Sequence, residues 1–167
     1  IDQLKDHVIQ IANTTYAGRH IFSGYKTDKP LIDKDGNYNI ALNKKEIFEY
    51  NVGVSERVSV NIVGIKVFGA SDGVPDNPDD FKKAFAQDTA GSGTTPTLIQ
   101  VFKDLSTALG NNDQDAIQKA LGNVEFSFEQ ILTVRSEVGA KMNRLELTEK
   151  KLDIQINNVK ELLSYNE

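Results

Sequence analysis

Few side chains in this sequence could do chemistry. The 167 residues include two histidines and no cysteine, so pairs of nucleophile and general base are scarce and thiolate chemistry is absent. His7 falls on an ordinary helical stretch and His20 lies at a turn, where a structural or solvated role is expected. The sequence contains no glycine-rich phosphate loop. These residues favour a protein that is not an enzyme and needs no cofactor.

Two acidic segments could attract a cation. Residues 33–37 read Asp-Lys-Asp-Gly-Asn, but the glycine is not at the sixth position and Lys44 occupies the twelfth, so the EF-hand interpretation fails. The second segment is an acidic cluster formed by Asp72, Asp76, Asp79 and Asp80. A solvated loop is the better interpretation of that cluster. We predict no metal site.

Composition limits the kinds of partner. With 39% hydrophobic and 26% charged residues and a net charge of -5, the chain fits one or two soluble, ordered domains. No basic patch is present to bind nucleic acid, and no run of eighteen apolar residues could span a membrane. The lack of cysteine is compatible with a secreted protein that travels unfolded. Because Ile1 is already in helical register, we expect a core fragment of a longer protein.

Two short helices are expected beside a longer one. Apolar spacing predicts a helix from residue 1 to about 17, which ends near Gly18, and a second over 97–109. Asn111 or Asn112 is expected to cap the helix that follows.

Between the short helices, the pattern changes to one typical of strands. Alternating β-branched and aromatic residues over 38–68 predict a small antiparallel sheet, and Asp35-Gly36 is a hairpin candidate. Residues 71–96 are interpreted as loop and linker around a possible short helix over 81–85.

The most informative feature is an apolar stripe at alternating three- and four-residue steps. We call it the seam; its members are Ile117, Leu121, Val124, Phe128, Ile131, Arg135, Val138, Met142, Leu145, Glu149, Leu152, Ile156, Val159 and Leu163. Only Arg135 and Glu149 interrupt it. The pattern predicts one continuous helix from Asp113 to Tyr165, about 80 Å long, with a coiled-coil-like face.

The predicted rod is longer than its partners in the chain. The two short helices span roughly 45 Å together, so about 35 Å of the seam needs another partner. We expect that partner in absent terminal segments or in neighbouring copies. The residues assigned to the seam and to assembly are Ile131, Val138, Gly139, Met142, Leu145, Leu152, Ile156 and Val159. Gly139 indicates either that another helix approaches closely there or that a long helix simply tolerates one glycine. Arg135 and Glu149 either set the register between packed helices or lie at exposed ends of the seam.

Several motifs resemble one family in order and spacing. Residues 12–24 read ANTTYAGRHIFSG and 26–30 read KTDKP, similar to the ANTxYxGxYIFSGxKTDxP segment of the bacterial flagellar hook-associated protein 3 family, which is related to flagellin. Residues 135–146 resemble its RxxVGAxxNRLE signature, and 58–64 and 67–69 its VxVNIxG and VFG patterns.

The resemblance is carried by particular residues. In the turn they are Tyr16, Gly18, Arg19, Ile21, Phe22, Ser23 and Gly24, and in the long helix Arg135, Asn143 and Arg144. His20 and Leu31 depart from the family pattern, in which Tyr and a second Pro are commoner.

The resemblance implies an α+β fold, with an elongated, coiled-coil-like helical domain built from both chain ends and an inserted small antiparallel β domain. The expected division is 1–24 with 96–167 for the rod and 25–95 for the insertion. It also implies a secreted subunit of the bacterial flagellum at the hook-filament junction. The implied partners are further copies, hook-associated protein 1, flagellin and an export chaperone, while the isolated fragment is expected to be monomeric.

Two alternatives compete with this interpretation. A filament-forming flagellin is less favoured, because its turn more often reads FNGxxLL where residues 21–24 read IFSG. A surface binding module formed by residues 25–95 is weaker still, because no polar and aromatic residues converge into a recognisable pocket there.

Overall fold

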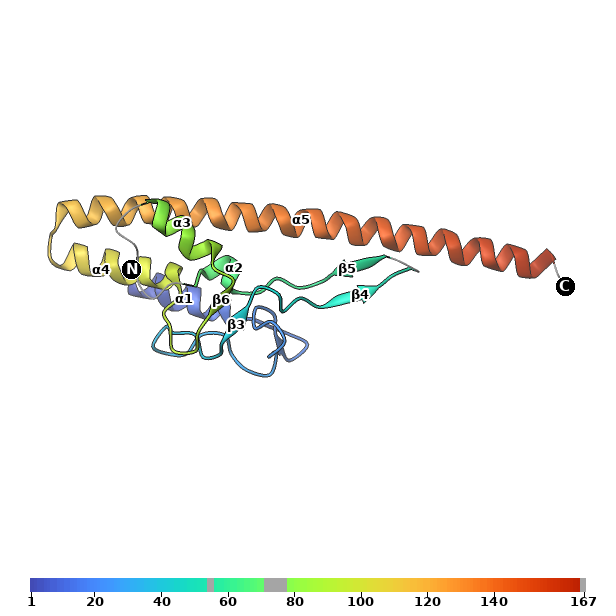
Figure 1. The fold of residues 1–167 in the computed structure, drawn as a ribbon, viewed down its shortest axis with the longest axis horizontal. Helices are drawn as coiled ribbons and strands as arrows, with labels where there is room; N and C mark the ends of the chain where they lie inside the picture. Colours follow the sequence, from blue (N-terminus) through green and yellow to red (C-terminus); the bar gives the residue numbers. More distant parts are fainter. Residues whose placement is uncertain (54–55, 71–77, 166–167) are drawn as a thin grey trace.

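The structure is a computed structural model that describes residues 1–53, 56–70 and 78–165, without the side chains of 78–80. Figure 1 shows a rod, helix α5, with a smaller body packed along its first half and its carboxyl end projecting beyond that body. The elements in chain order are α1 (Asp2–Ala12), β1 (Thr15–Tyr16), β2 (Arg19–His20), β3 (Leu42–Asn43), β4 (Glu49–Asn51), β5 (Arg57–Ser59), α2 (Ile65–Phe68), α3 (Pro78–Ala86), β6 (Thr89–Ala90), α4 (Thr97–Gly110) and α5 (Gln114–Tyr165).

The long helix is confirmed as one continuous element. At 1.5 Å per residue its 52 residues extend about 78 Å. Its cap differs from the expected one: Asp113 Oδ1, not Asn111 or Asn112, accepts the N–H of Ala116 at 3.1 Å. Asn112 instead has a positive φ of 53° and forms the bend between α4 and α5.

The first helix ends earlier than predicted. It stops at Ala12, and β1 and β2 form a two-residue hairpin whose turn residues Ala17 and Gly18 have φ of 49° and 75°. Two successive positive φ values match the twist of a tight hairpin and cannot continue a helix. The Asn13 side chain stabilises the break, because it accepts from the Ile32 N–H at 2.9 Å and donates to the Ile32 carbonyl at 2.7 Å.

The predicted single sheet over 38–68 was wrong in detail. Within the described residues the strands form three separate two-stranded antiparallel sheets, β1-β2, β3-β6 and β4-β5, and residues 65–68 are helical. The Asp35-Gly36 turn is present, with a φ of 84° at Gly36. The segments that it connects form only an isolated antiparallel bridge between Ile32 and Tyr38 and not a hairpin of two strands. Pairing of β3 with the distant β6 is a long-range contact that local alternation does not reveal.

The body has one main core, which is shared by α1, α2, α4, strands β3 and β6 and the segment between β2 and β3. Its buried members are Ala12, Leu31, Ile32, Tyr38, Ile40, Leu42, Val63, Ile65, Phe68, Ala70, Ala90, Leu98 and Ile99. Phe81, Phe85 and Val101 form a second cluster, against which Val124 and Phe126 of α5 pack. The main core therefore draws on both sides of the expected domain boundaries, and the division into rod and inserted domain stays a prediction.

Candidate assembly surface

The most deeply buried residues of α5 lie beside the seam, although the seam member Val124 also packs against the second core cluster. The buried residues of α5 are Ala120, Asn123, Ser127, Val134 and Thr148. Ala120, Asn123, Ser127 and Val134 each precede a seam position by one residue, which rotates them about 100° around the helix. Small and polar side chains thus line the inner contact, where Ser127 Oγ and Thr148 Oγ1 each donate to the carbonyl four residues earlier.

The apolar seam is left partly in water. Its seven apolar members assigned to assembly are between 36% and 56% exposed: Ile131, Val138, Met142, Leu145, Leu152, Ile156 and Val159. From residue 149 to 165 every residue of the helix is exposed. Fully burying one large apolar side chain contributes roughly 1.5 to 3 kcal/mol of free energy. Because these seven side chains are already about half buried, covering the rest would contribute about 5 to 10 kcal/mol in total. A contiguous apolar strip of this kind is typical of an interaction surface.

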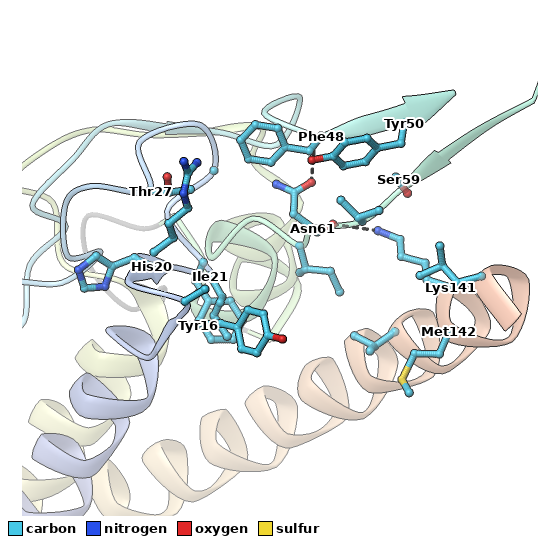
Figure 2. A pocket seen from close by; sticks show the side chains of 18 residues that line it. Tyr16, His20, Ile21, Thr27, Phe48, Tyr50, Ser59, Asn61, Lys141 and Met142 are labelled. Carbon is cyan, nitrogen blue, oxygen red and sulfur yellow. Dashed lines mark hydrogen bonds between the residues drawn. The ribbon is translucent and has the colours of Figure 1, made fainter. Parts of the chain in front are cut away.

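A groove of about 730 Å³ lies beside the middle of the seam. Its helix wall is formed by Val138, Met142 and Leu145, and its other walls come from the β1-β2 hairpin and the β4-β5 ribbon. Figure 2 shows Tyr16 and Ile21 below the ribbon, with Met142 on the facing helix. The groove is lined mainly by apolar and aromatic side chains, which suits an apolar helix face better than a charged ligand.

Long polar side chains connect α5 to the ribbon. Lys141 Nζ donates to the Asn61 carbonyl at 3.2 Å, as the dashed line in Figure 2 shows. Farther along the helix, Arg144 Nη2 donates to the Arg57 carbonyl at 3.0 Å, and Lys151 Nζ pairs with Glu56 Oε2 at 2.8 Å. The hydrogen bond and charge of Lys151 lower the pKa of Glu56.

A second carboxylate, Glu137, joins α5 to α2. Its Oε1 lies 3.0 Å from Lys66 Nζ and 3.2 Å from Lys141 Nζ. Burial acts to raise the pKa of Glu137, but the hydrogen bonds and charges of the two lysines outweigh it and leave the pKa lowered. The carboxylate is therefore charged at neutral pH.

The motif turn divides into a buried and an exposed half. Phe22 packs edge-on to Phe68, with 5.6 Å between ring centroids, and the buried Ser23 Oγ donates to the Lys29 carbonyl at 2.9 Å. Gly24 has a φ of 59°, and the Glu46 side chain fills the space that a Cβ would need. These three residues therefore hold the turn in place.

The other half of the turn faces the groove. Tyr16 is 80% exposed although it is large and aromatic, and Ile21 is also exposed. Both line the groove together with Arg19. Gly18 supplies the positive φ of the hairpin that presents them.

The long-helix motif residues are not gathered at one point. Arg135 and Asn143 are exposed, while Arg144 reaches the ribbon. A Cβ placed on Gly139 would meet nothing within 4 Å, so no close approach occurs there within the described part of this chain.

Sequence reasoning missed the ribbon and its helix contacts. Tyr50 and Val60 line the groove, and Lys141 and Lys151 bridge to the ribbon, yet none was predicted as a site residue. The sequence did contain a signal for the helix contacts. Charged residues such as Lys141, Arg144 and Lys151 each precede a seam position by one residue, so they recur along one helix face with the period of the seam.

The residues with chemical potential do not form a centre. His20 Nδ1 lies 3.0 Å from the Asn13 carbonyl oxygen, a structural contact, and His7 is exposed. Across the part of the chain that the structure describes, no three His, Asp or Glu side chains gather as metal ligands. Asp72 and Asp76 of the acidic cluster, and the side chains of Asp79 and Asp80, lie outside the description. No helix within the described ranges has both the length and the apolar character of a membrane span.

Comparison with known proteins agrees with the motifs. The chain is 31% identical over 153 residues to flagellar hook-associated protein 3 of Escherichia coli, covering 87% of this chain and 46% of that protein. It is 27% identical over 151 residues to the protein of the same name from Salmonella typhimurium, covering 85% and 44%. No protein-family model matches. The chain thus spans less than half the length of these curated relatives.

The fold agrees as well. The crystal structure of Bacillus cereus FlgL matches with a TM-score of 0.62 and 23% identity, covering 92% of this chain and 64% of that one. That match supports the predicted α+β class, with a long carboxyl-terminal helix and small antiparallel sheets. By sequence, the chain is a homologue of flagellar hook-associated protein 3.

Proposed function

We propose that this chain is part of a structural subunit that joins the hook of the bacterial flagellum to its filament. The subunit acts by helix-mediated self-assembly and carries out no catalysis. The observation that supports this most directly is the exposed seam of α5. Exposing an apolar strip of that length to water is unfavourable in free energy, so such strips mark surfaces that another protein covers.

Assembly follows from the chemistry of the seam. Neighbouring copies cover the strip at Leu152, Ile156 and Val159, and burial of the strip favours the ordered helix only at a site where partners are present. Arg135 and Glu149 set the register between packed helices, since a charge placed within a seam penalises misaligned pairings. Gly139 allows a neighbouring helix to approach closely.

The remaining partners belong to the same proposal. On the flagellum, hook-associated protein 1 lies on one side of the subunit and flagellin on the other. Before assembly, the protein is bound by an export chaperone and is secreted unfolded. In this arrangement, residues 1–24 with 96–167 form the rod and residues 25–95 are carried outward.

Electron microscopy of a strain that lacks the gene tests the role. The proposal expects completed hooks without attached filaments and flagellin in the medium. A strain with normal filaments would contradict the junction role. Loss of both filament and secreted flagellin would point to a filament-forming flagellin instead.

Complementation with the full-length gene tests the surface. Leu152→Asp combined with Ile156→Asp places two charges in the seam, so filaments are expected to remain detached. The matched control is Leu147→Asp with Ile154→Asp, two exposed apolar residues on the opposite face of the same helix. Immunoblots of the medium verify export of both variants, and full rescue by the exported seam variant would contradict the proposed surface.

A further inference from the structure

The β4-β5 ribbon is only thinly supported by apolar packing. It has three residues in each strand, with Tyr50 opposite Val58, and such a two-stranded ribbon is marginal by itself in water. Among the strand residues Val58 alone is buried. Something beyond its own pairing must hold it beside α5.

Polar side chains from one helix face supply that support. Arg144 and Lys151 lie seven residues apart, two turns along α5, and reach Arg57 and Glu56 near the end of the ribbon. Between them lies Thr148, which is buried although its neighbours on the helix are exposed. The burial of Thr148 and Val58 indicates that the ribbon rests on the helix at this point.

The position of the ribbon sets the width of the groove. Tyr50 and Val60 form its ribbon wall, opposite Val138, Met142 and Leu145 of the seam. Figure 2 shows the ribbon and the helix as opposing walls, with Lys141 reaching Asn61, two residues beyond β5. Movement of the ribbon away from α5 would therefore uncover the middle of the seam.

We propose that the ribbon is an ionic latch, closed on α5 by Arg144 and Lys151 and released as ionic strength rises. Release widens the groove and exposes the central seam residues to an incoming helix. The latch is a property of this chain alone; its role in regulating access to the seam rests on the proposed function.

Screening gives the latch its sensitivity. The Lys151 side chain is 58% exposed and that of Glu56 is 33% exposed, so water and salt reach the pair. The Debye length falls from about 30 Å at 0.01 M salt to about 3 Å at 1 M, which removes most of the attraction between exposed charges. Glu56 is also near Arg144, so release separates Glu56 from both cations on α5, whereas Arg57 keeps its partner Glu49 inside the ribbon at 3.7 Å.

Distance measurement between two spin labels tests the latch. The chain has no cysteine, so Asn51→Cys on the ribbon and Glu146→Cys on α5, both exposed, label the two sides cleanly. The expected result is one main distance at 10 mM NaCl and a larger population at longer distances at 1 M NaCl. Lys151→Met is expected to raise the released-to-docked ratio about 1.4- to 5-fold at 10 mM NaCl, the range for one exposed ion pair.

Two further variants separate charge from packing. Lys150→Met removes a neighbouring lysine that forms no ion pair within the described ranges, and it is expected to match the parent. Val58→Ala removes apolar contact and is expected to raise the released fraction at both salt concentrations. Equal distance distributions at 10 mM and 1 M NaCl, unchanged by Lys151→Met, would overturn the latch. Failure of the junction role in cells, with these distances still responding to salt, would leave the latch standing.

Discussion

The two halves of α5 share one helical backbone but differ in what covers them (Figure 1). Helices α2, α3 and α4 pack against the first half of α5, where Ala120, Asn123, Ser127 and Val134 are buried. From residue 149 onward the whole circumference is exposed. A lone helix gains little from hydrogen bonding alone, and most helical stability in proteins comes from packing of an apolar face. The first half is therefore stable with the body, whereas the second half depends on a partner.

The largest expected difference in the free energy of unfolding is between a variant of a body residue and a variant of a seam residue. Phe81 is fully buried, with its ring centroid 5.5 Å from Phe85 and 6.0 Å from Phe126. Phe81→Ala is expected to lower the free energy of unfolding by about 3 to 5 kcal/mol, whereas Ile156→Ala changes it by less than about 0.5 kcal/mol in the isolated chain. Urea unfolding followed by circular dichroism measures both; equal losses would break the contrast.

A buried hydroxyl gives the next largest effect. Tyr38 Oη donates to the Gly69 carbonyl at 2.6 Å, and burial strongly raises the pKa of Tyr38. Tyr38→Phe leaves that carbonyl without its donor, so a loss of about 1 to 3 kcal/mol is expected in the same unfolding measurement. Tyr50→Phe, on the exposed ribbon, is the matched control and is expected to unfold like the parent.

Gly139 lies between the two regions and is half-buried. Its replacement is expected to have opposite effects in the isolated chain and in the flagellum. Gly139→Ala adds a methyl group that meets nothing within 4 Å, so it should stabilise the isolated helix by about 1 kcal/mol in thermal unfolding. In the assembled flagellum the same methyl group should hinder a close helix contact and weaken filament attachment. Normal attachment together with the added stability would favour simple tolerance of glycine.

The smallest expected effect is a pH dependence of the free energy of unfolding, which arises at Glu137 where α5 contacts α2. The lowered pKa of Glu137 means that the unfolded chain binds more protons than the folded chain as pH falls. The stabilisation is fully present above the ordinary value of 4.5 and is lost as the pH falls through the lower folded value. Its size is no more than about 1 kcal/mol, because the side chain is 37% exposed and screened by solvent.

The control for this pH dependence is a neutral side chain of similar shape. In Glu137→Gln the carboxylate facing Lys66 and Lys141 is absent. We expect its unfolding free energy to vary less with pH between 3 and about 6 than that of the parent. Parallel curves for the two proteins would exclude Glu137 as the source.

Features with a long or strong local signal could be predicted from sequence. The seam repeats over many turns, so α5 was predicted almost to the residue, and the turn over 12–24 pointed to the correct relatives. The first helix was predicted too long because Ala17-Gly18 lacks the usual asparagine or aspartate of a tight hairpin.

The rest depended on contacts between distant segments. Pairing of β3 with β6 and the reach of Arg144 and Lys151 to the ribbon join residues more than forty positions apart. The sequence also did not show which face of α5 packs on the body. Asn123 and Ser127 are polar and were expected at the surface, but both are buried where α5 packs on the body. Periodicity locates a helix face but does not say what covers it.

Amide hydrogen exchange along α5 tests the central claim most directly. For the isolated chain, shown to be monomeric by light scattering, we predict strong protection over residues 114–134 and rapid exchange over 152–165, which lie beyond the contact of Lys151 with the ribbon. In flagella that contain the protein, the second segment should become protected. Uniformly high protection from 114 to 165 in the isolated monomer would contradict the account, because it would mean that the exposed half of the helix needs no partner.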